Sequence, residues 1–388
     1  MDEDSKLILS RYFKEYYFRY SNRIREPSEI ESREFGYTHF GGGMIRHLNY
    51  SDIGTLRALL VKEAPAGVYC SNSYYLEPSA EMSKKGWIKA DMIFDIDADL
   101  LKLPCKKDHD VWFCKQCGRK EFGLRPPECP FCKSNKLLES SWACPNCLQG
   151  TKAETFKLID FLKSDFGIDE TEIRVYFSGN AGYHLEVFDS SLETLDQHGR
   201  SEISDYLTAQ GAMTAQYFTQ KLSPSDPGWR GRVARYIRDL PPDAPPFRTS
   251  EYAKRLLEMI KDHESAEMEK VLQLAIKSNA VKLDAMVTTD IHRIFRMPET
   301  LNQKTGLIKR ECQDLSSFDP MTQAIALPDS AEEVEIMTDI CPKVEIGGRA
   351  YGPFRNEKAK LPLYVTVYLI AKGGAKVAKS EENTKSTG

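Results

Sequence analysis

The sequence lacks the features that direct a chain into or across a membrane. Its N-terminus, Met1 to Lys6, is acidic, whereas a secretory signal has basic residues followed by an apolar stretch. The apolar run near the C-terminus, Leu363 to Ala371, is too short to span a bilayer as a helix. We therefore expect an intracellular protein that does not bind a membrane.

The sequence also lacks the excess of basic residues that many nucleic-acid-binding domains carry. Its 53 Lys and Arg residues are outnumbered by 57 Asp and Glu residues, which gives a net charge of −4. Local clusters can still contact phosphates, and the sequence contains two: Lys84, Lys85 and Lys89, and Arg230, Arg232, Arg235 and Arg238. Such runs are equally typical of a solvated helix face, so both interpretations stay open.

The order of the expected elements indicates an α/β (α+β) fold, with a mixed sheet flanked by helices. Apolar residues recur at helical spacing near the N-terminus and after the last cysteine pair, and strand-like segments surround a glycine turn. The expected helices are 7–20 and 151–166, and the expected strands are 44–48, 91–97, 172–177 and 184–188. Strands that alternate with helices in this way are typical of an α/β core.

The chain divides into a core and two insertions. The assigned segments are the core at 1–190 and 281–372, a cysteine-rich zinc-binding insertion at 103–149, a helical insertion at 191–280 and a disordered tail at 373–388. Within the helical insertion, 201–221 and 250–279 are predicted to be helices, separated by the proline-rich stretch 239–246. The segment 361–371 alternates like a β-strand.

Ten cysteines in a chain expected to be intracellular favour metal ligands or free thiols over disulfides. Seven of them fall between Cys105 and Cys147, and six of these form three Cys-x-x-Cys pairs. Together with His109 they provide eight candidate ligands. Because structural zinc takes four such ligands, we predict two zinc ions.

We assign the eight ligands to two nested groups because nesting keeps both loops short. The inner group is Cys114, Cys117, Cys129 and Cys132, and the outer group is Cys105, His109, Cys144 and Cys147. A competing arrangement pairs the second and third Cys-x-x-Cys motifs and leaves Cys105, His109, Cys114 and Cys117 for the other ion. Spacing alone does not decide between the two arrangements.

Two aspartates, Asp95 and Asp97, end the run Asp91-Met-Ile-Phe-Asp-Ile-Asp97. Because side chains two residues apart on a strand point to the same face, their carboxylates meet over one spot, while the alternating apolar residues anchor the other face in a core. Converging carboxylates repel each other, and a hard divalent ion such as Mg²⁺ relieves that repulsion. The pair therefore predicts a metal site for phosphoryl transfer, against the alternative of solvated surface residues.

A glycine-containing turn, Ser178-Gly-Asn-Ala-Gly-Tyr-His184, joins two of the expected strands. Gly179 and Gly182 would let backbone N–H groups approach an anion closely, and Ser178 and His184 would add side-chain donors. The alternative is a tight turn with a packed histidine.

In this order the segments resemble the catalytic small subunit of the archaeal and eukaryotic DNA primases over most of the chain. The motifs that carry the resemblance are the aromatic helix at 12–20, Ser32-Arg-Glu-Phe35, Met44-Ile-Arg46, Ala66-Gly-Val-Tyr69, Phe94-Asp-Ile-Asp97, the cysteines, Ser178-Gly-x-x-Gly-x-His184, Leu283-Asp284 and Arg296-Met-Pro-Glu-Thr-Leu-Asn-Gln-Lys-Thr-Gly306. The series is more specific than any single motif.

The resemblance implies a third metal-binding carboxylate, Asp284, brought beside Asp95 and Asp97, with Asp290 as its local competitor. It also implies residues that face the triphosphate of a nucleotide: Ser178, Gly179, Gly182, His184, Arg46 and Lys304. The family's outer zinc site matches the outer cysteine group.

Two departures from the family are visible. Asn180 and Ala181 stand where eukaryotic members have basic residues, so part of the charge that binds phosphate must come from elsewhere. The inner cysteine group looks like an insertion that many relatives lack, and its role stays open between contact with template DNA and contact with a partner subunit.

The function that the resemblance implies is that of a nucleotidyltransferase, a DNA primase that makes short RNA primers from nucleoside triphosphates on single-stranded DNA. The cofactors would be two catalytic Mg²⁺ or Mn²⁺ ions and one or two structural Zn²⁺ ions. The family's large subunit carries an iron–sulfur cluster, for which this chain has no spare cysteine set, so we expect a heterodimer. The archaeal likeness favours the cytoplasm, and the nucleus would apply to a eukaryotic member.

Two alternatives stay open. One is a primase-polymerase of the same superfamily that extends strands with deoxynucleotides in repair. The other is a non-catalytic, zinc-stapled subunit that binds nucleic acid.

Overall fold

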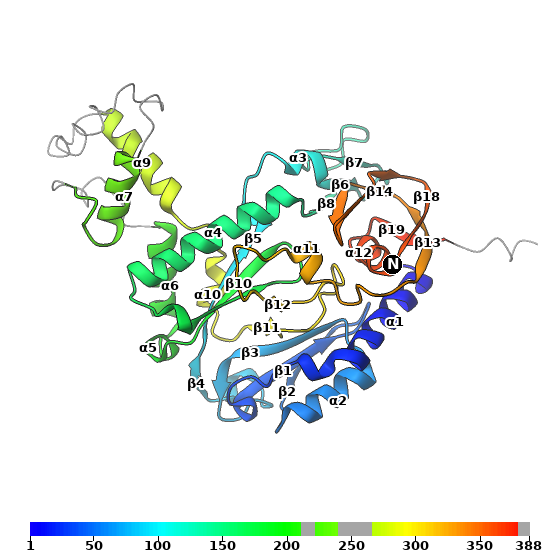
Figure 1. Cartoon of the computed structure of the whole chain (residues 1–388), viewed down its shortest axis with the longest axis horizontal. Helices are drawn as coiled ribbons and strands as arrows, with labels where there is room; N and C mark the ends of the chain where they lie inside the picture. Colours follow the sequence, from blue (N-terminus) through cyan, green and yellow to red (C-terminus); the bar gives the residue numbers. More distant parts are fainter. Residues whose placement is uncertain (211–221, 240–265, 379–388) are drawn as a thin grey trace, which may run out of the picture.

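Two antiparallel sheets, with helices around them, form the centre of the molecule in the computed structural model, which describes residues 1–210, 222–239 and 266–378 (Figure 1). Sheet A has the order β11-β3-β1-β2, with β4 paired to β3, and contains β1 (Arg33–Thr38), β2 (Met44–Leu48), β3 (Gly67–Tyr75), β4 (Trp87–Ala90) and β11 (Ile294–Arg296). Sheet B has the order β12-β9-β10-β5 and contains β5 (Met92–Asp97), β9 (Ile173–Phe177), β10 (Gly182–Val187) and β12 (Arg310–Glu311). The predicted α/β (α+β) class is confirmed, and α+β describes it more closely because the strand pairs are antiparallel.

The alternation along β5 decides which way its side chains point. Met92, Phe94 and Ile96 are fully buried in the main core, together with Leu158 and Phe161 of α4 (Pro145–Ser164). On the other face of the strand, the apolar neighbours come from a separate small cluster that includes a residue of sheet A. The predicted division of β5 into an apolar face and an acidic face is therefore confirmed, and the acidic face points toward sheet A.

The N-terminal helix α1 (Glu3–Tyr20) covers the core and connects it to the C-terminal third of the chain (Figure 1). Asp2 caps it by accepting from the Ser5 amide at 2.9 Å. Three buried tyrosine hydroxyls bond distant backbone atoms: Tyr12 with the Leu327 amide, Tyr16 with the Glu299 carbonyl and Tyr17 with the Leu301 amide. The helix predicted for 7–20 is confirmed, and α2 (Ile53–Glu63) packs beside it.

In the described part of the predicted helical insertion, the regular elements are all helices. They are α5 (Ser190–Glu193), α6 (Gln197–Thr208), α7 (Gly228–Arg238) and α9 (Ala266–Asn279). Their apolar residues belong to the same core as sheet B, and α6 also packs against α10 (Ala285–Thr289). The predicted helices 201–221 and 250–279 are confirmed in part, since 211–221 and 250–265 lie outside the described residues, as does most of the proline-rich 239–246.

The remaining elements are short and lie in the cysteine-rich insertion or near the C-terminus. They are α3 (Lys106–His109), β6 (Val111–Cys114), β7 (Lys120–Phe122), β8 (Leu137–Ser140), α11 (Pro320–Gln323), β13 (Glu333–Thr338), β14 (Ile340–Cys341), β15 (Val344–Ile346), β16 (Arg349–Tyr351), β17 (Phe354–Arg355), β18 (Lys358–Pro362), α12 (Leu363–Ala371) and β19 (Ala375–Val377). Sheets form among β7-β6-β8 and β18-β13-β19.

Two predictions near the C-terminus are wrong. The segment 361–371 is not one strand, because only its first two residues belong to β18 and α12 begins at Leu363. Most of its side chains are buried, and a short run that is apolar on all sides has no period that separates a helix from a strand. The tail is not disordered from Gly373, since β19 pairs with β13 through backbone hydrogen bonds that a polar sequence does not reveal. Residues 379–388 lie outside the described residues.

In the described ranges, no helix is both long enough and apolar enough to cross a bilayer. The division into separate domains stays a prediction.

Arg200 of α6 holds the start of β5 in place. It is fully buried, and its guanidinium donates to the backbone oxygens of Ala90, Asp91 and Leu195 at 2.6, 2.9 and 2.9 Å. We expect Arg200→Met to lower the free energy of unfolding by roughly 2–4 kcal/mol, because it leaves buried carbonyl oxygens without donors. Urea unfolding followed by circular dichroism measures this. His198→Ala on the exposed side of the same helix should change stability by less than about 0.5 kcal/mol, and equal losses in the two variants would contradict the assignment.

Candidate active site

The glycine turn lies opposite the acidic pair because β10 and β5 pair in one register. His184 is opposite Asp95, and Gly182 is opposite Asp97. His184 and Asp95 point to the same side of sheet B, with His184 Nε2 lying 3.5 Å from Asp95 Oδ1. Two motifs that are far apart in the sequence therefore meet at one place.

The third predicted carboxylate also reaches this place. The Asp284 amide donates to the Asp95 carbonyl at 2.9 Å, and Asp284 caps α10 by accepting from the Met286 amide at 3.0 Å. Asp290 lies at the other end of α10 and accepts from the His292 amide at 2.9 Å. Asp284, rather than its competitor Asp290, is thus the residue beside Asp95.

Like charges and burial act together on the acidic pair. Burial, and then the charges of Asp97 and Asp284, raise the pKa of Asp95 to about 7. Burial and the Asp99 charge raise the pKa of Asp97. One oxygen of each, Oδ1, is buried without a hydrogen-bond partner.

These oxygens have the chemistry that a hard divalent ion requires. Within the described ranges, however, only the two cysteine groups have ligand atoms that all lie within 4.8 Å of one another. The three carboxylates are therefore neighbours, and Asp95 and Asp97 each have one oxygen without a partner, but the three do not form a compact set of ligand atoms.

His184 is a neutral donor or acceptor at this site. Burial lowers its pKa well below the usual value, and the nearby charges of Lys309, Arg296 and Arg293 lower it further. Its Nδ1 is buried without a partner. Because a neutral imidazole forms no ion pair with Asp95, both groups stay available to a bound molecule.

The turn is supported from behind by the segment after β11. Asn302 Nδ2 donates to the Ser178 carbonyl at 3.3 Å, and Thr305 Oγ1 donates to the Gly179 carbonyl. Gly179 has φ +81°, and a Cβ there would lie 2.9 Å from Asn302 Cβ, so only glycine fits this turn.

Basic residues differ in how closely they approach the site. Lys304 is exposed, and its charge opposes the rise in the pKa of Asp97. Arg46 instead donates to Glu34 at 2.8 and 3.2 Å, so its charge is already paired within sheet A. The predicted nucleotide contacts of these residues are not tested by the structure.

Sequence reasoning missed several basic residues near the site: Lys309, Arg293, Arg296 and Lys372. Arg296 belongs to a motif that the resemblance used, so that motif was the available signal. Lys309 is fully buried and bonds Glu186 at 2.9 Å. No feature of the sequence indicated that Lys372 lies near the site, because no motif connects it to the glycine turn.

Neither basic cluster noted in the sequence is an open row of cations. Lys85 is 1% exposed and lies 3.4 Å from Glu34, and Arg232 is buried between Asp160 and Asp165. The other contacts are Lys84 with Glu81, Lys89 with Glu29 and Glu193, Arg230 with Asp226, Arg235 with the Pro224 carbonyl and Arg238 with Asp239. Internal pairing explains these residues better than phosphate contact does.

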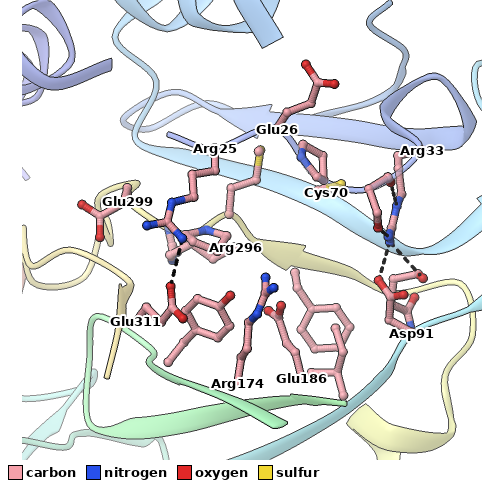
Figure 2. Close-up of a pocket in the computed structure, with 18 of the residues that line it drawn as sticks. Arg25, Glu26, Arg33, Cys70, Asp91, Arg174, Glu186, Arg296, Glu299 and Glu311 are labelled. Atoms are coloured by element: carbon pink, nitrogen blue, oxygen red, sulfur yellow. Dashed lines mark hydrogen bonds and ion pairs between the residues drawn. The ribbon is translucent and has the colours of Figure 1, made fainter. Parts of the chain in front are cut away.

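A cavity of about 700 Å³ lies between the two sheets (Figure 2). Ile93 and Glu186 line it, and they face each other on β5 and β10, one step along the ladder from Asp95 and His184. The cavity therefore extends the space over the acidic face, away from the glycine turn.

Ion pairs cross the walls of this cavity. Figure 2 shows Arg25 joined to Glu311 and Arg33 joined to Asp91, at 3.5 and 2.7 Å. These two pairs neutralise four of the charges that line the cavity, and other charged residues, among them Arg174, Arg296 and Glu186, also line it.

The two cysteine groups form as nested sets. Tetrahedral zinc with Zn–S bonds of about 2.3 Å holds its sulfur ligands about 3.8 Å apart. In the inner group, the sulfur atoms of Cys114 and Cys132 are 3.5 Å apart, and those of Cys117 and Cys129 are 3.7 Å apart. The geometry fits zinc, and all four ligand atoms lie within 4.8 Å of one another.

The outer group has the same compact form. Cys147 Sγ lies 3.7 Å from Cys105 Sγ, 3.8 Å from Cys144 Sγ and 3.2 Å from His109 Nε2. The nested assignment is confirmed as a grouping of ligands, and the competing arrangement is wrong. The nested grouping follows from the fold, because β6 pairs with β8 and brings the first and last parts of the insertion together.

Asp110 orients the histidine of the outer group. His109 Nδ1 lies 3.0 Å from Asp110 Oδ1, which leaves Nε2 free to face the cysteines. The same carboxylate oxygen accepts from the Trp142 amide at 3.0 Å. Asp110 thereby joins the two ends of the insertion.

Comparisons with known proteins agree with this arrangement. The family model described as DNA primase small subunit matches residues 138–313, which include the glycine turn and Asp284. The DNA primase small subunit PriS of Nitrosopumilus maritimus (strain SCM1) is 35% identical over 386 residues, covering 97% of this chain and 100% of that protein. The chain belongs to the DNA primase small subunit family.

Other members of the family are similarly matched over their full length. PriS of Cenarchaeum symbiosum (strain A) is 37% identical, covering 97% of this chain and 100% of that protein. PriS of Thermoplasma acidophilum is 31% identical, covering 95% and 98%. The resemblance inferred from the motifs is thus confirmed for the whole chain.

Zinc content tests the two cysteine groups of this family member. We expect about two zinc ions per chain, falling to about one in Cys147→Ser and to about one in Cys129→Ser, because each substitution breaks one group. Elemental analysis of the purified proteins measures this. Cys312→Ser, at a cysteine outside both groups, should keep two ions. Loss of both ions from either variant would show that the groups do not bind independently.

The close approach at Gly182 gives a second test. A Cβ there would lie 2.1 Å from the Ile96 carbonyl oxygen and 2.7 Å from Asp97 Oδ1. Gly182→Ala should push β10 away from β5 and lower the free energy of unfolding by about 1–3 kcal/mol. Gly43→Ala, with no atom within 4 Å of the new Cβ, is the matched control in denaturant unfolding. A Gly182→Ala protein as stable as this control would contradict the register described above.

Proposed function

We propose that this protein is a DNA primase that synthesises short RNA primers on single-stranded DNA by nucleotidyl transfer. One observation carries the proposal: three carboxylates from β5 and the start of α10 lie beside a glycine turn that carries a neutral histidine. Carboxylates that bind metal next to a turn that binds phosphate are what phosphoryl transfer requires. Family membership supports the same activity.

Each part of the site has a role in this reaction. Asp95, Asp97 and Asp284 would hold divalent ions, Mg²⁺ or Mn²⁺, because Asp95 and Asp97 each have an unpaired oxygen and the charges of Asp97 and Asp284 act on Asp95. Two such ions held by these residues would supply Lewis-acid chemistry, which would lower the pKa of the attacking hydroxyl and stabilise the leaving pyrophosphate. Ser178 and His184 would donate to phosphate oxygens and fix the triphosphate in line with the attack.

The basic residues around the site would balance the charge of the nucleotide. Lys304 is exposed and its charge acts on Asp97, and Arg296 lies near His184, whereas the charge of Lys309 is paired with Glu186. These groups are in place before the substrate arrives, so they cost little reorganisation during the reaction. Positioning and charge, rather than covalent chemistry by the protein, would carry the rate.

The substrates would be nucleoside triphosphates and a single-stranded DNA template, and the partner would be a large subunit. Seven of the ten cysteines belong to the two nested groups, and the other three, Cys70, Cys312 and Cys341, lie apart from each other in the core. An iron–sulfur cluster would therefore belong to the partner. Action in the cytoplasm stays an expectation.

Substitution of the carboxylates tests the proposal. Asp95→Asn, Asp97→Asn and Asp284→Asn should each lower primer synthesis by about 10²–10³-fold or more, because each removes a metal ligand charge. Their stability should be unchanged or higher, since each also relieves repulsion between buried charges. Primer formation on unprimed single-stranded DNA, with the melting temperature of each variant, measures both effects.

Asp290→Asn is the matched control, because Asp290 lies on the same short helix but away from Asp95. It should keep activity within about threefold. Full activity in Asp95→Asn would refute the catalytic assignment.

The same assay separates the two alternative functions. Incorporation of deoxynucleotides in preference to ribonucleotides would favour a primase-polymerase, and template binding without metal-dependent incorporation would favour a non-catalytic subunit.

A further inference from the structure

Lys372, directly after α12, touches the glycine turn from a distant part of the chain. Its Nζ donates to Asn180 Oδ1 at 2.8 Å, and Asn180 is one of the two inner residues of the turn. Nζ also donates to the Ser141 carbonyl at 3.2 Å, in the cysteine-rich insertion. The lysine therefore stands where the turn, the insertion and the C-terminal helix meet.

Both acceptors of Lys372 are neutral. Within the described ranges it makes no ion pair, although the carboxylates of Asp97, Asp99 and Asp110 and the ammonium of Lys304 all act on it from nearby. Burial lowers the pKa of Lys372 to about 8, and the Asp99 charge opposes that shift. The group is thus a half-buried cation at neutral pH whose charge no direct contact neutralises.

A purely structural role does not explain a cation at this place. Two carbonyl-type acceptors could be satisfied by a neutral donor without the cost of burying a charge. The turn beside it has only Asn180 and Ala181 between its glycines, so its own side chains bring no positive charge to a bound anion. Lys372 brings a positive charge to the turn, and its charge acts on Asp97, as the charge of Lys304 does.

We propose that Lys372 binds the triphosphate of the incoming nucleotide, with its Nζ donating to a phosphate oxygen over the 178–182 turn. Asn180 Oδ1 holds the ammonium beside the turn, and the Ser141 carbonyl fixes it from the side of the insertion. This inference rests on the proposed nucleotidyl transfer, because it names a further substrate contact for that reaction. It also connects the outer cysteine group to substrate binding, since Ser141 lies three residues before Cys144.

The test uses the full chain and two neutral variants. Lys372→Gln keeps a donor for Asn180 and Ser141 but removes the charge, and Lys372→Met removes both. We expect each variant to raise KM for the nucleoside triphosphate by about 10–100-fold, with kcat changed by less than about threefold, because loss of one charged hydrogen bond has that effect on affinity. Lys376→Met, at an exposed lysine on β19, is the control.

Two further measurements separate phosphate binding from a structural role. Inorganic tripolyphosphate should inhibit the Lys372→Gln enzyme about tenfold more weakly than the unchanged enzyme, whereas inhibition by a nucleoside should not change. Adding Asn180→Lys to Lys372→Gln should restore much of the affinity for the triphosphate, because it places a cation in the same turn.

The two proposals fail in different ways. If the unchanged protein makes no primers, even with a large subunit, the proposed function fails. If it makes primers and Lys372→Gln has the same KM and the same inhibition by tripolyphosphate, the assignment of Lys372 fails while the function stands.

Discussion

Repulsion between Asp95 and Asp97 is the constraint around which the site is built. The two carboxylates share one face of a strand whose other face is fully buried, so neither can turn away without exposing the core. Asp284 adds a third negative charge at the end of α10. The fold tolerates this cost because packing of β5 between α4 and sheet A stabilises the strand independently of its acidic face.

Segments from the whole chain hold this acidic face in place. β10 fixes the glycine turn opposite it, the 302–309 segment supports the turn from behind, and Lys372 touches the turn from the C-terminal helix. Arg200 secures the start of β5 through backbone oxygens. These contacts fix the parts of the site relative to one another, and charges held in fixed positions act most strongly on a transferred phosphoryl group.

The cysteine-rich insertion lies between β5 and α4 in the chain, and its outer group joins its two ends. Its outer group includes Cys144 and Cys147, at the start of α4, and Cys105, which follows β5 closely. Closing the loop at its base lets the inner group form a separate small unit with its own apolar cluster. Metal binding by the outer group would therefore stabilise both the end of β5 and the start of α4.

The sequence by itself determined the local patterns: the alternation of β5, the helix at 7–20, the cysteine pairs, and the series of motifs that identified the family. These depend on residues close together in the chain, where spacing alone decides which face a side chain occupies. Only the tertiary structure decided that Asp284 rather than Asp290 lies beside Asp95, that the cysteine groups are nested, that Arg46 is paired with Glu34, and that Lys372 reaches the turn. It also showed that 363–371 is a helix. The sequence could not show this, because an apolar run that is buried on every side has no periodicity that distinguishes a helix from a strand. Each of these depends on strand register and packing between distant segments, which local spacing does not specify.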